Sequence, residues 1–260
     1  MTLEEAIRQA EAGDVKSMIQ LGDFYMDQNT GEGISKAVGW YEKAAERNIY
    51  YAFRMSALGR KILGSAGMAV ADQLGAWDHA LEDWEKAREW SFKALACIDR
   101  GDQNVKPGDR ESIYADLNAE NYHMGICKYM MKEDIDAIAL LQGIDETKAK
   151  VLLGVCTFRM GKQMEDYAKA YDGLSCIERD RVYCTAKKSS AEEDIYAVAA
   201  LQLSGIYRLG VPGVVKIDLN QAVQVLENAY ASIESDEFKQ MDLNERNHYK
   251  KKLFGGYKYN

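Results

Sequence analysis

The chain has 260 residues, and its 33 lysines and arginines against 41 aspartates and glutamates give a formal net charge of −8. This acidic balance argues against nucleic acid as a partner, because a protein that neutralises phosphates needs a basic surface. Hydrophobic residues make up 47% of the sequence, as in folded proteins, and only two prolines occur. Because proline interrupts helix interiors and is typical of turns, its scarcity predicts a mostly helical fold.

The sequence also indicates a compartment. Its apolar runs are too short to cross a bilayer, which takes about 20 residues. The N-terminal residues are acidic, whereas a secretory signal has basic residues followed by an apolar stretch. The five cysteines are an odd and scattered set, which fits a reducing compartment better than a disulfide framework. We therefore expect a cytoplasmic protein with no membrane segment.

The first predicted elements are two helices within residues 12–46. Helical spacing relates a first set of residues, Ser17, Leu21, Gly22 and Tyr25, and a second set, Ala37, Trp40, Tyr41, Ala44 and Ala45. Small residues allow two helices to approach closely, and the aromatic rings fill the space that remains between them. This stretch therefore predicts an antiparallel pair of packed helices.

The same spacing returns along the chain. The residues equivalent to Gly22 are Gly59, Gly125, Gly154 and Ser204. The repeats predict five helix pairs, at residues 3–48, 49–100, 109–144, 145–180 and 190–235. A last helix over residues 236–254 is expected to cap the stack, because repeats must cover their final hydrophobic face. The prediction is an all-α protein with a single helical-repeat domain over residues 1–260.

Residues 12–46 contain the motif AGD…LGDFY…GEG…KAVGWYEKAAE, and residues 199–230 repeat part of it. In these residues the chain resembles the Sel-one-like repeat family, a relative of the tetratricopeptide repeat. The resemblance implies a right-handed superhelix of antiparallel helix pairs that holds proteins together, and it implies no enzymatic activity. One departure is the distance from Gly59 to Ala87, which is 28 residues against 15 in the first pair. The second pair therefore carries an insertion or a longer first helix.

The sequence offers no convincing catalytic or cofactor motif. Gly31-Glu32-Gly33 lacks the third glycine and the preceding strand of a dinucleotide fingerprint, and we interpret it as a turn in which glycine supplies a positive φ. His123 and Cys127 share one face of a predicted helix, but a zinc site needs three or four ligands and no second pair supplies the rest. We therefore expect no catalytic residues, no metal and no cofactor.

Helical geometry indicates where a partner would bind. The face of each first helix opposite its core stripe should line the concave side of the superhelix, where such proteins bind. The basic and aromatic residues expected there are Lys16, Arg60, Lys148, Arg159, Arg208, Phe53, Tyr122, Tyr129 and Phe158. Only Asp23 and Asp27 are acidic on this face. We expect a peptide or protein partner with acidic groups, such as a free C-terminal carboxylate; alternatively, these charges only keep the face soluble.

Three functions from different classes follow. The leading hypothesis is a non-catalytic scaffold or adaptor that binds a partner peptide or protein on the concave face. An alternative is a ligand- or substrate-binding protein, including an enzyme, with a pocket near the enlarged second pair, where Gly64, Gly67 and Gly75 would permit close backbone approach. A third is a dimer formed through an exposed helical face. The sequence leaves the oligomeric state open.

Overall fold

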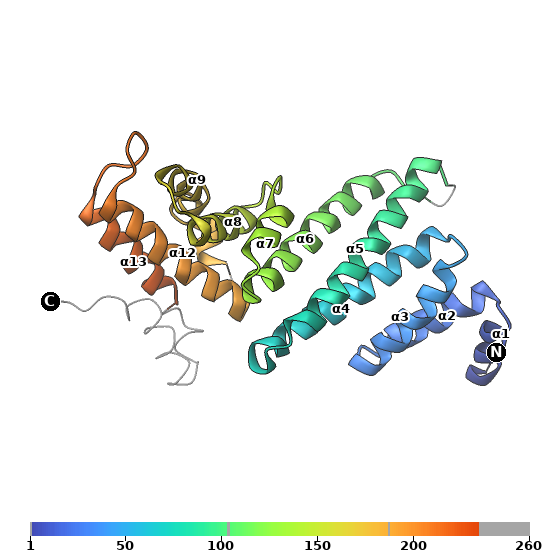
Figure 1. The fold of residues 1–260 in the computed structure, drawn as a ribbon. Coiled ribbons are helices and arrows are strands. Elements are labelled where there is room, and N and C mark those ends of the chain that lie inside the picture. The colour runs from blue at the N-terminus through green and yellow to red at the C-terminus, as the bar shows by residue number, and fades with distance from the viewer. Residues whose placement is uncertain (1, 103–104, 187, 234–260) are drawn as a thin grey trace. The chain divides into compact units, whose positions relative to one another are not determined.

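A computed structural model describes residues 2–102, 105–186 and 188–233. These residues form thirteen α-helices, and the β-type pairing found among them is a bridge between Val211 and Val215 (Figure 1). The prediction of an all-α fold is confirmed. The predicted capping helix at residues 236–254 lies outside the described residues.

The chain divides into two compact units, Met1–Cys127 and Lys128–Asn260. The N-terminal unit contains α1 (Leu3–Glu11), α2 (Val15–Met26), α3 (Gly31–Ala45), α4 (Tyr50–Leu74), α5 (Trp77–Arg100) and most of α6 (Asp109–Met130). The C-terminal unit contains α7 (Asp134–Leu141), α8 (Thr147–Met160), α9 (Met164–Leu174), α10 (Cys176–Arg179), α11 (Arg181–Thr185), α12 (Ser190–Leu209) and α13 (Leu219–Ile233). A single domain over the whole chain stays a prediction.

Consecutive helices pack together within each unit. The packed pairs are α2 with α3, α4 with α5, α8 with α9, and α12 with α13. Each of these pairs falls within one predicted repeat, and the predicted third repeat contains α6 and α7. The repeat spacing of the sequence therefore locates the helices of the fold.

Polar side chains determine where the first three helices begin. A side-chain oxygen of Thr2, Asp14 and Thr30 accepts a hydrogen bond from the backbone amide three residues further on. Each bond satisfies a donor that the start of a helix leaves without a helical partner. The three N-caps therefore separate the helices of the first repeat.

The turn before α3 differs from the expectation. Gly31 and Gly33 lie inside α3, and the residue with positive φ in this turn is Asn29, at 48°. The interpretation that these glycines supply the positive φ is therefore wrong. Gly33 is needed for another reason, because a Cβ on it would lie 2.8 Å from the carbonyl oxygen of Tyr25.

The repeated small residues mark the points where helices cross. A Cβ on Gly22 would overlap the ring of Tyr41 on α3, and one on Gly59 would overlap Val38. In the C-terminal unit, a Cβ on Gly154 would lie 2.8 Å from a backbone nitrogen of α9. These close contacts explain why the sequence repeats glycine at this position.

The second pair is enlarged because both of its helices are long. Helix α4 has 25 residues and α5 has 24. A Cβ on Gly64 would lie 2.8 Å from Nε1 of Trp84, and one on Gly67 would lie 3.2 Å from Cβ of Ala80. Gly75 ends α4 with a φ of 69°. Two of these glycines therefore accommodate the contact with α5, and the third terminates the helix.

Candidate functional site

The predicted partner-binding residues of the N-terminal unit lie in different environments. Lys16 is exposed on α2, whereas Phe53 and Tyr122 are only 3% and 1% exposed. Phe53 stacks on Trp90 in the core, with ring centroids 5.8 Å apart. The expectation that Phe53 and Tyr122 offer a contact surface is therefore wrong. The reason is that α4 and α6 each bury more than one face. Helix α4 packs against both α3 and α5, and Glu120 of α6 accepts a hydrogen bond from Ser91 of α5.

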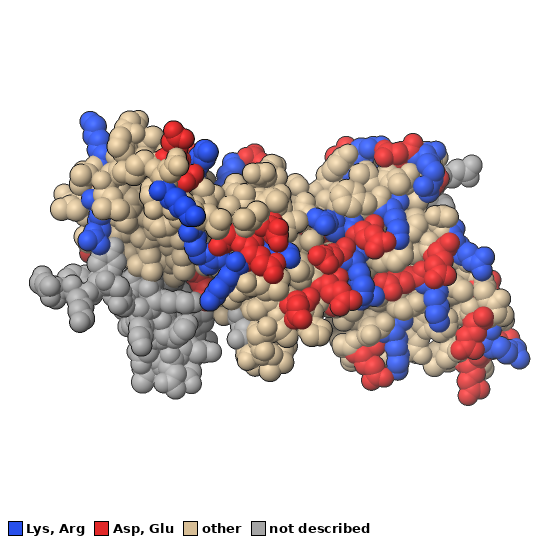
Figure 2. Space-filling model, in the orientation of Figure 1, with Lys and Arg blue, Asp and Glu red and all other residues tan. Residues whose placement is uncertain are grey.

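Arg60 lies between two carboxylates. Its Nε lies 2.9 Å from Oε1 of Glu42, and its Nη1 lies 2.7 Å from Oδ1 of Asp83. Oε1 of Glu42 also accepts a hydrogen bond of 3.1 Å from Nε1 of Trp90. The cluster joins α3, α4 and α5, and Figure 2 shows acidic and basic side chains lying beside one another over this unit. The charge of Arg60 is therefore balanced within the fold.

Arg159 is held in a similar way in the C-terminal unit. Its Nε donates to Oδ2 of Asp134 at 2.6 Å, and its Nη2 donates to the other carboxylate oxygen and to the carbonyl of Tyr129. The guanidinium carbon also lies 4.3 Å from the centroid of the Tyr129 ring. Asp134 and Tyr129 are both buried, so the expectation that Tyr129 offers a contact surface is wrong. Arg159 neutralises a carboxylate that the packing of α7 against α8 removes from water.

The remaining predicted residues lie nearer the surface. Nζ of Lys148 lies 3.4 Å from Oε2 of Glu146 in an ion pair that is open to solvent. Arg208 is exposed at the end of α12, and Phe158 is half-buried near the end of α8. The predicted face is therefore accessible in the C-terminal unit at Phe158 and Arg208.

A cavity opens beside Phe158. We define the apolar groove as this cavity of about 100 Å³, lined by Phe158, Met164, Tyr167, Ile206, Leu209, Gly210 and Val211. The rings of Phe158 and Tyr167 pack with centroids 5.0 Å apart. Leu209 is 76% exposed, and Met164 is also exposed. The apolar groove therefore presents large apolar side chains to solvent around a small hollow.

Sequence reasoning found only Phe158 among the residues of the apolar groove. Leu209 directly follows the predicted Arg208, and it is a large apolar residue immediately before a glycine at a helix end. This position could have indicated an exposed apolar side chain. Met164 and Tyr167 lie on α9, the second helix of its pair, so a prediction restricted to first helices omits them. Val211 lies in the turn after α12 and is positioned by Gly210, whose φ is 71°.

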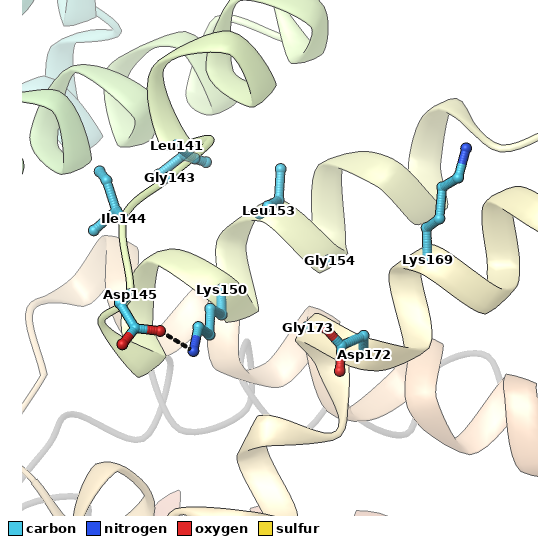
Figure 3. Close-up of a pocket in the computed structure, with 10 residues that line it drawn as sticks. All are labelled: Leu141, Gly143, Ile144, Asp145, Lys150, Leu153, Gly154, Lys169, Asp172 and Gly173. Carbon is cyan, nitrogen blue, oxygen red and sulfur yellow. Dashed lines mark ion pairs between the residues drawn. The ribbon is translucent and has the colours of Figure 1, made fainter.

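A second cavity of the C-terminal unit carries charged residues (Figure 3). We define the charged cleft as this cavity of about 280 Å³, lined by Leu141, Gly143, Ile144, Asp145, Lys150, Leu153, Gly154, Lys169, Asp172 and Gly173. Nζ of Lys150 lies 2.5 Å from Oδ1 of Asp145. Figure 3 shows these two side chains pointing toward each other, with Lys169 extending away from them. None of these residues was predicted from the sequence to belong to a binding site.

One acidic residue of the N-terminal unit is completely buried. Glu120 is 0% exposed, and its Oε1 accepts a hydrogen bond of 2.7 Å from Oγ of Ser91. Its Oε2 has no hydrogen-bond partner among the described residues. Burial raises the pKa of Glu120 to about 7, and the hydrogen bond from Ser91 opposes this rise only in part.

The residue pair considered for metal binding lies in the same unit. The ring of His123 stacks on Trp84, with centroids 4.3 Å apart, and Cys127 is buried. Over the described part of the chain, no group of three or more His, Cys, Asp or Glu side chains is arranged to hold a metal ion. Within the same residues, no helix combines the length and the apolar character that a bilayer crossing needs.

Comparison with known proteins finds no family model that matches the chain and no curated protein with a significant sequence match.

Proposed function

We propose that the protein is a non-catalytic interaction module built from helical repeats similar to Sel-one-like repeats, and that its C-terminal unit binds a partner peptide in the apolar groove. The observation that carries this proposal is the hollow itself, around which Leu209 and Met164 expose large apolar side chains. Exposed apolar surface around a concave site is typical of protein interaction sites. The cytoplasmic location expected from the cysteines stays a prediction.

The dimensions of the apolar groove restrict the partner. A cavity of about 100 Å³ has room for a single side chain of roughly leucine or methionine size. Ile206 is a buried residue of the lining, while Leu209 is an exposed one. We therefore expect an extended peptide that inserts one aliphatic residue as an anchor.

Charge next to the apolar groove favours an acidic group beside the anchor. Arg208 is exposed and directly precedes Leu209 in α12. Arg159 follows Phe158, but its guanidinium already holds Asp134. Arg208 is therefore the exposed cation beside the groove that an acidic side chain or a C-terminal carboxylate of the peptide would meet, and a guanidinium can bond both oxygens of a carboxylate.

A peptide library displayed against the full chain tests the anchor. We expect the selected peptides to share an aliphatic residue, and we expect Leu209→Asp to weaken their binding at least about tenfold in fluorescence polarisation, because a carboxylate would be buried beside the anchor. Val182→Asp is the matched control, since Val182 is 77% exposed in the same unit but does not line the groove. Peptides without a common aliphatic residue, or equal losses in both variants, would contradict the proposal.

A second pair of variants tests the charge. Arg208→Glu should weaken the binding of peptides that carry an acid beside the anchor, and the loss should shrink as salt is added. Arg181→Glu introduces the same reversal at an exposed position on α11 and serves as the control. Peptides with a neutral residue in place of the acid should bind wild type and Arg208→Glu equally.

A further inference from the structure

The charged cleft is separate from the apolar groove and shares no lining residue with it. It lies beside the crossing of α8 and α9, where Gly154 and Gly173 bring the two backbones together. A Cβ on Gly154 would lie 2.8 Å from a backbone nitrogen of α9, and one on Gly173 would overlap the carbonyl oxygen of Lys150. Both glycines line the cleft, and because neither position can carry a side chain, the two backbones are in close contact there.

One side of the charged cleft is apolar. Leu141 and Ile144, at the end of α7 and in the loop after it, are buried, and Leu153 of α8 is half-buried. Figure 3 shows Ile144 next to Asp145 in the loop after α7, and Leu153 on α8 about one turn after Lys150. An aliphatic group of a ligand would therefore find apolar contacts beside an ion pair.

The ion pair itself is open to solvent. The side chain of Asp145 is 97% exposed, and that of Lys150 is 41% exposed. The hydrogen bond between them raises the pKa of Lys150 and lowers the pKa of Asp145, so both groups are charged near neutral pH. The carboxylate keeps a second oxygen for a ligand, and the ammonium keeps further N–H donors.

We propose that the charged cleft binds the zwitterion of a free amino acid with an aliphatic side chain. The ligand carboxylate lies against Lys150, its ammonium lies against Asp145, and its side chain contacts Ile144 and Leu153. A ligand with a single charge would meet a like charge on one member of the ion pair, whereas a zwitterion satisfies both members. The cavity of about 280 Å³ lies near the lower end of the sizes of ligand pockets, as a single amino acid requires.

Three probes of the same skeleton test the charge requirement by calorimetric titration of the full chain. L-leucine carries both charges, 4-methylpentanoate lacks the ammonium, and 3-methylbutylamine lacks the carboxylate. We expect leucine to bind at least about tenfold more tightly than either single-charge probe. Each of those probes pairs with one member of the ion pair and is repelled by the like charge of the other member. A leucine affinity equal to that of either probe, or no detectable leucine binding, would overturn the proposal.

Two variants test the assigned roles. Asp145→Asn should lower the affinity for leucine at least about tenfold and make 4-methylpentanoate the preferred probe, while Lys150→Met should make 3-methylbutylamine preferred. The ion pair is open to solvent, so the variants should keep the thermal unfolding midpoint of the wild type. Glu32→Gln and Lys36→Met break an exposed ion pair of the N-terminal unit and serve as controls. Wild-type leucine affinity in both cleft variants would overturn the proposal.

The proposal is independent of peptide binding, and the same reagents show this. Leu209→Asp should keep the wild-type affinity for leucine, and Asp145→Asn should keep the wild-type affinity for selected peptides. Loss of leucine binding in Leu209→Asp would contradict a separate amino-acid site.

Discussion

Glu120 provides a quantitative test of the packing in the N-terminal unit. Its carboxyl group is inaccessible to water, has one hydrogen bond from Ser91 and leaves one oxygen without a partner among the described residues. The charged groups that act on its pKa are Lys61 and Arg54 on α4, which favour the ionised form, and Asp116 on α6, which opposes it. Burial outweighs the two cations, so the folded protein binds the Glu120 proton more tightly than the unfolded chain does.

The sign and size of the effect follow from this pKa. The ordinary value is 4.5, and the value in the fold is about 7. Because the pKa of Glu120 is higher in the fold than in the unfolded chain, the protonated carboxyl group favours folding. This contribution to the free energy of unfolding is fully present below about pH 4.5 and is lost as the pH rises through 7. At about 1.4 kcal/mol for each pH unit, the ionised carboxylate lowers the free energy of unfolding by about 3 kcal/mol above pH 7.

The substitution Glu120→Gln removes the ionisation and keeps the shape and the acceptor for Ser91. We expect its effect on the free energy of unfolding to be within about 1 kcal/mol of zero near pH 5, and to become stabilising by about 2–3 kcal/mol near pH 9, because only the wild type then buries a charge. Urea titrations followed by tryptophan fluorescence measure this directly, since all four tryptophans lie in the N-terminal unit.

Glu111→Gln is the matched control, because Glu111 is exposed on the same helix. Its effect should differ by no more than about 0.5 kcal/mol between the two pH values. If Glu120→Gln also has the same effect near pH 5 and near pH 9, the buried carboxylate does not control the pH dependence of stability.

Two other substitutions test single contacts. Gly22→Ala should lower the free energy of unfolding by about 2 kcal/mol, because its methyl group overlaps the ring of Tyr41, whereas Gly39→Ala, which meets no described atom within 4 Å, should raise it by about 0.5–1 kcal/mol. Tryptophan fluorescence in urea separates the two, and equal effects would contradict the contact. Asp134→Asn should destabilise the C-terminal unit by about 2 kcal/mol, because Arg159 loses its charged partner. Circular dichroism during urea unfolding measures the loss, and an unchanged midpoint would show that the ion pair adds nothing.

The sequence by itself determined the class of fold and the positions of the helices. Helix formation depends on neighbours three and four residues apart, so the spacing of small and apolar residues identified the pairs. Gly22, Gly59 and Gly154 occupy helix crossings as expected, because the requirement for a small residue at a close contact is imposed locally. The enlarged spacing of the second pair indicated an insertion or a longer first helix, and the structure shows that both of its helices are long.

Only the tertiary structure decided which helix faces reach solvent. Phe53, Tyr122 and Tyr129 lie opposite the core stripe of their own helices, yet neighbouring helices cover them. The sequence predicted that Arg60 and Arg159 bind a partner. In the structure, each of them neutralises a carboxylate that belongs to another helix. The spacing of residues within one helix indicates which side chains face its partner helix. Whether a third helix buries the opposite face depends on contacts between segments distant in the sequence, and no local pattern contains these contacts.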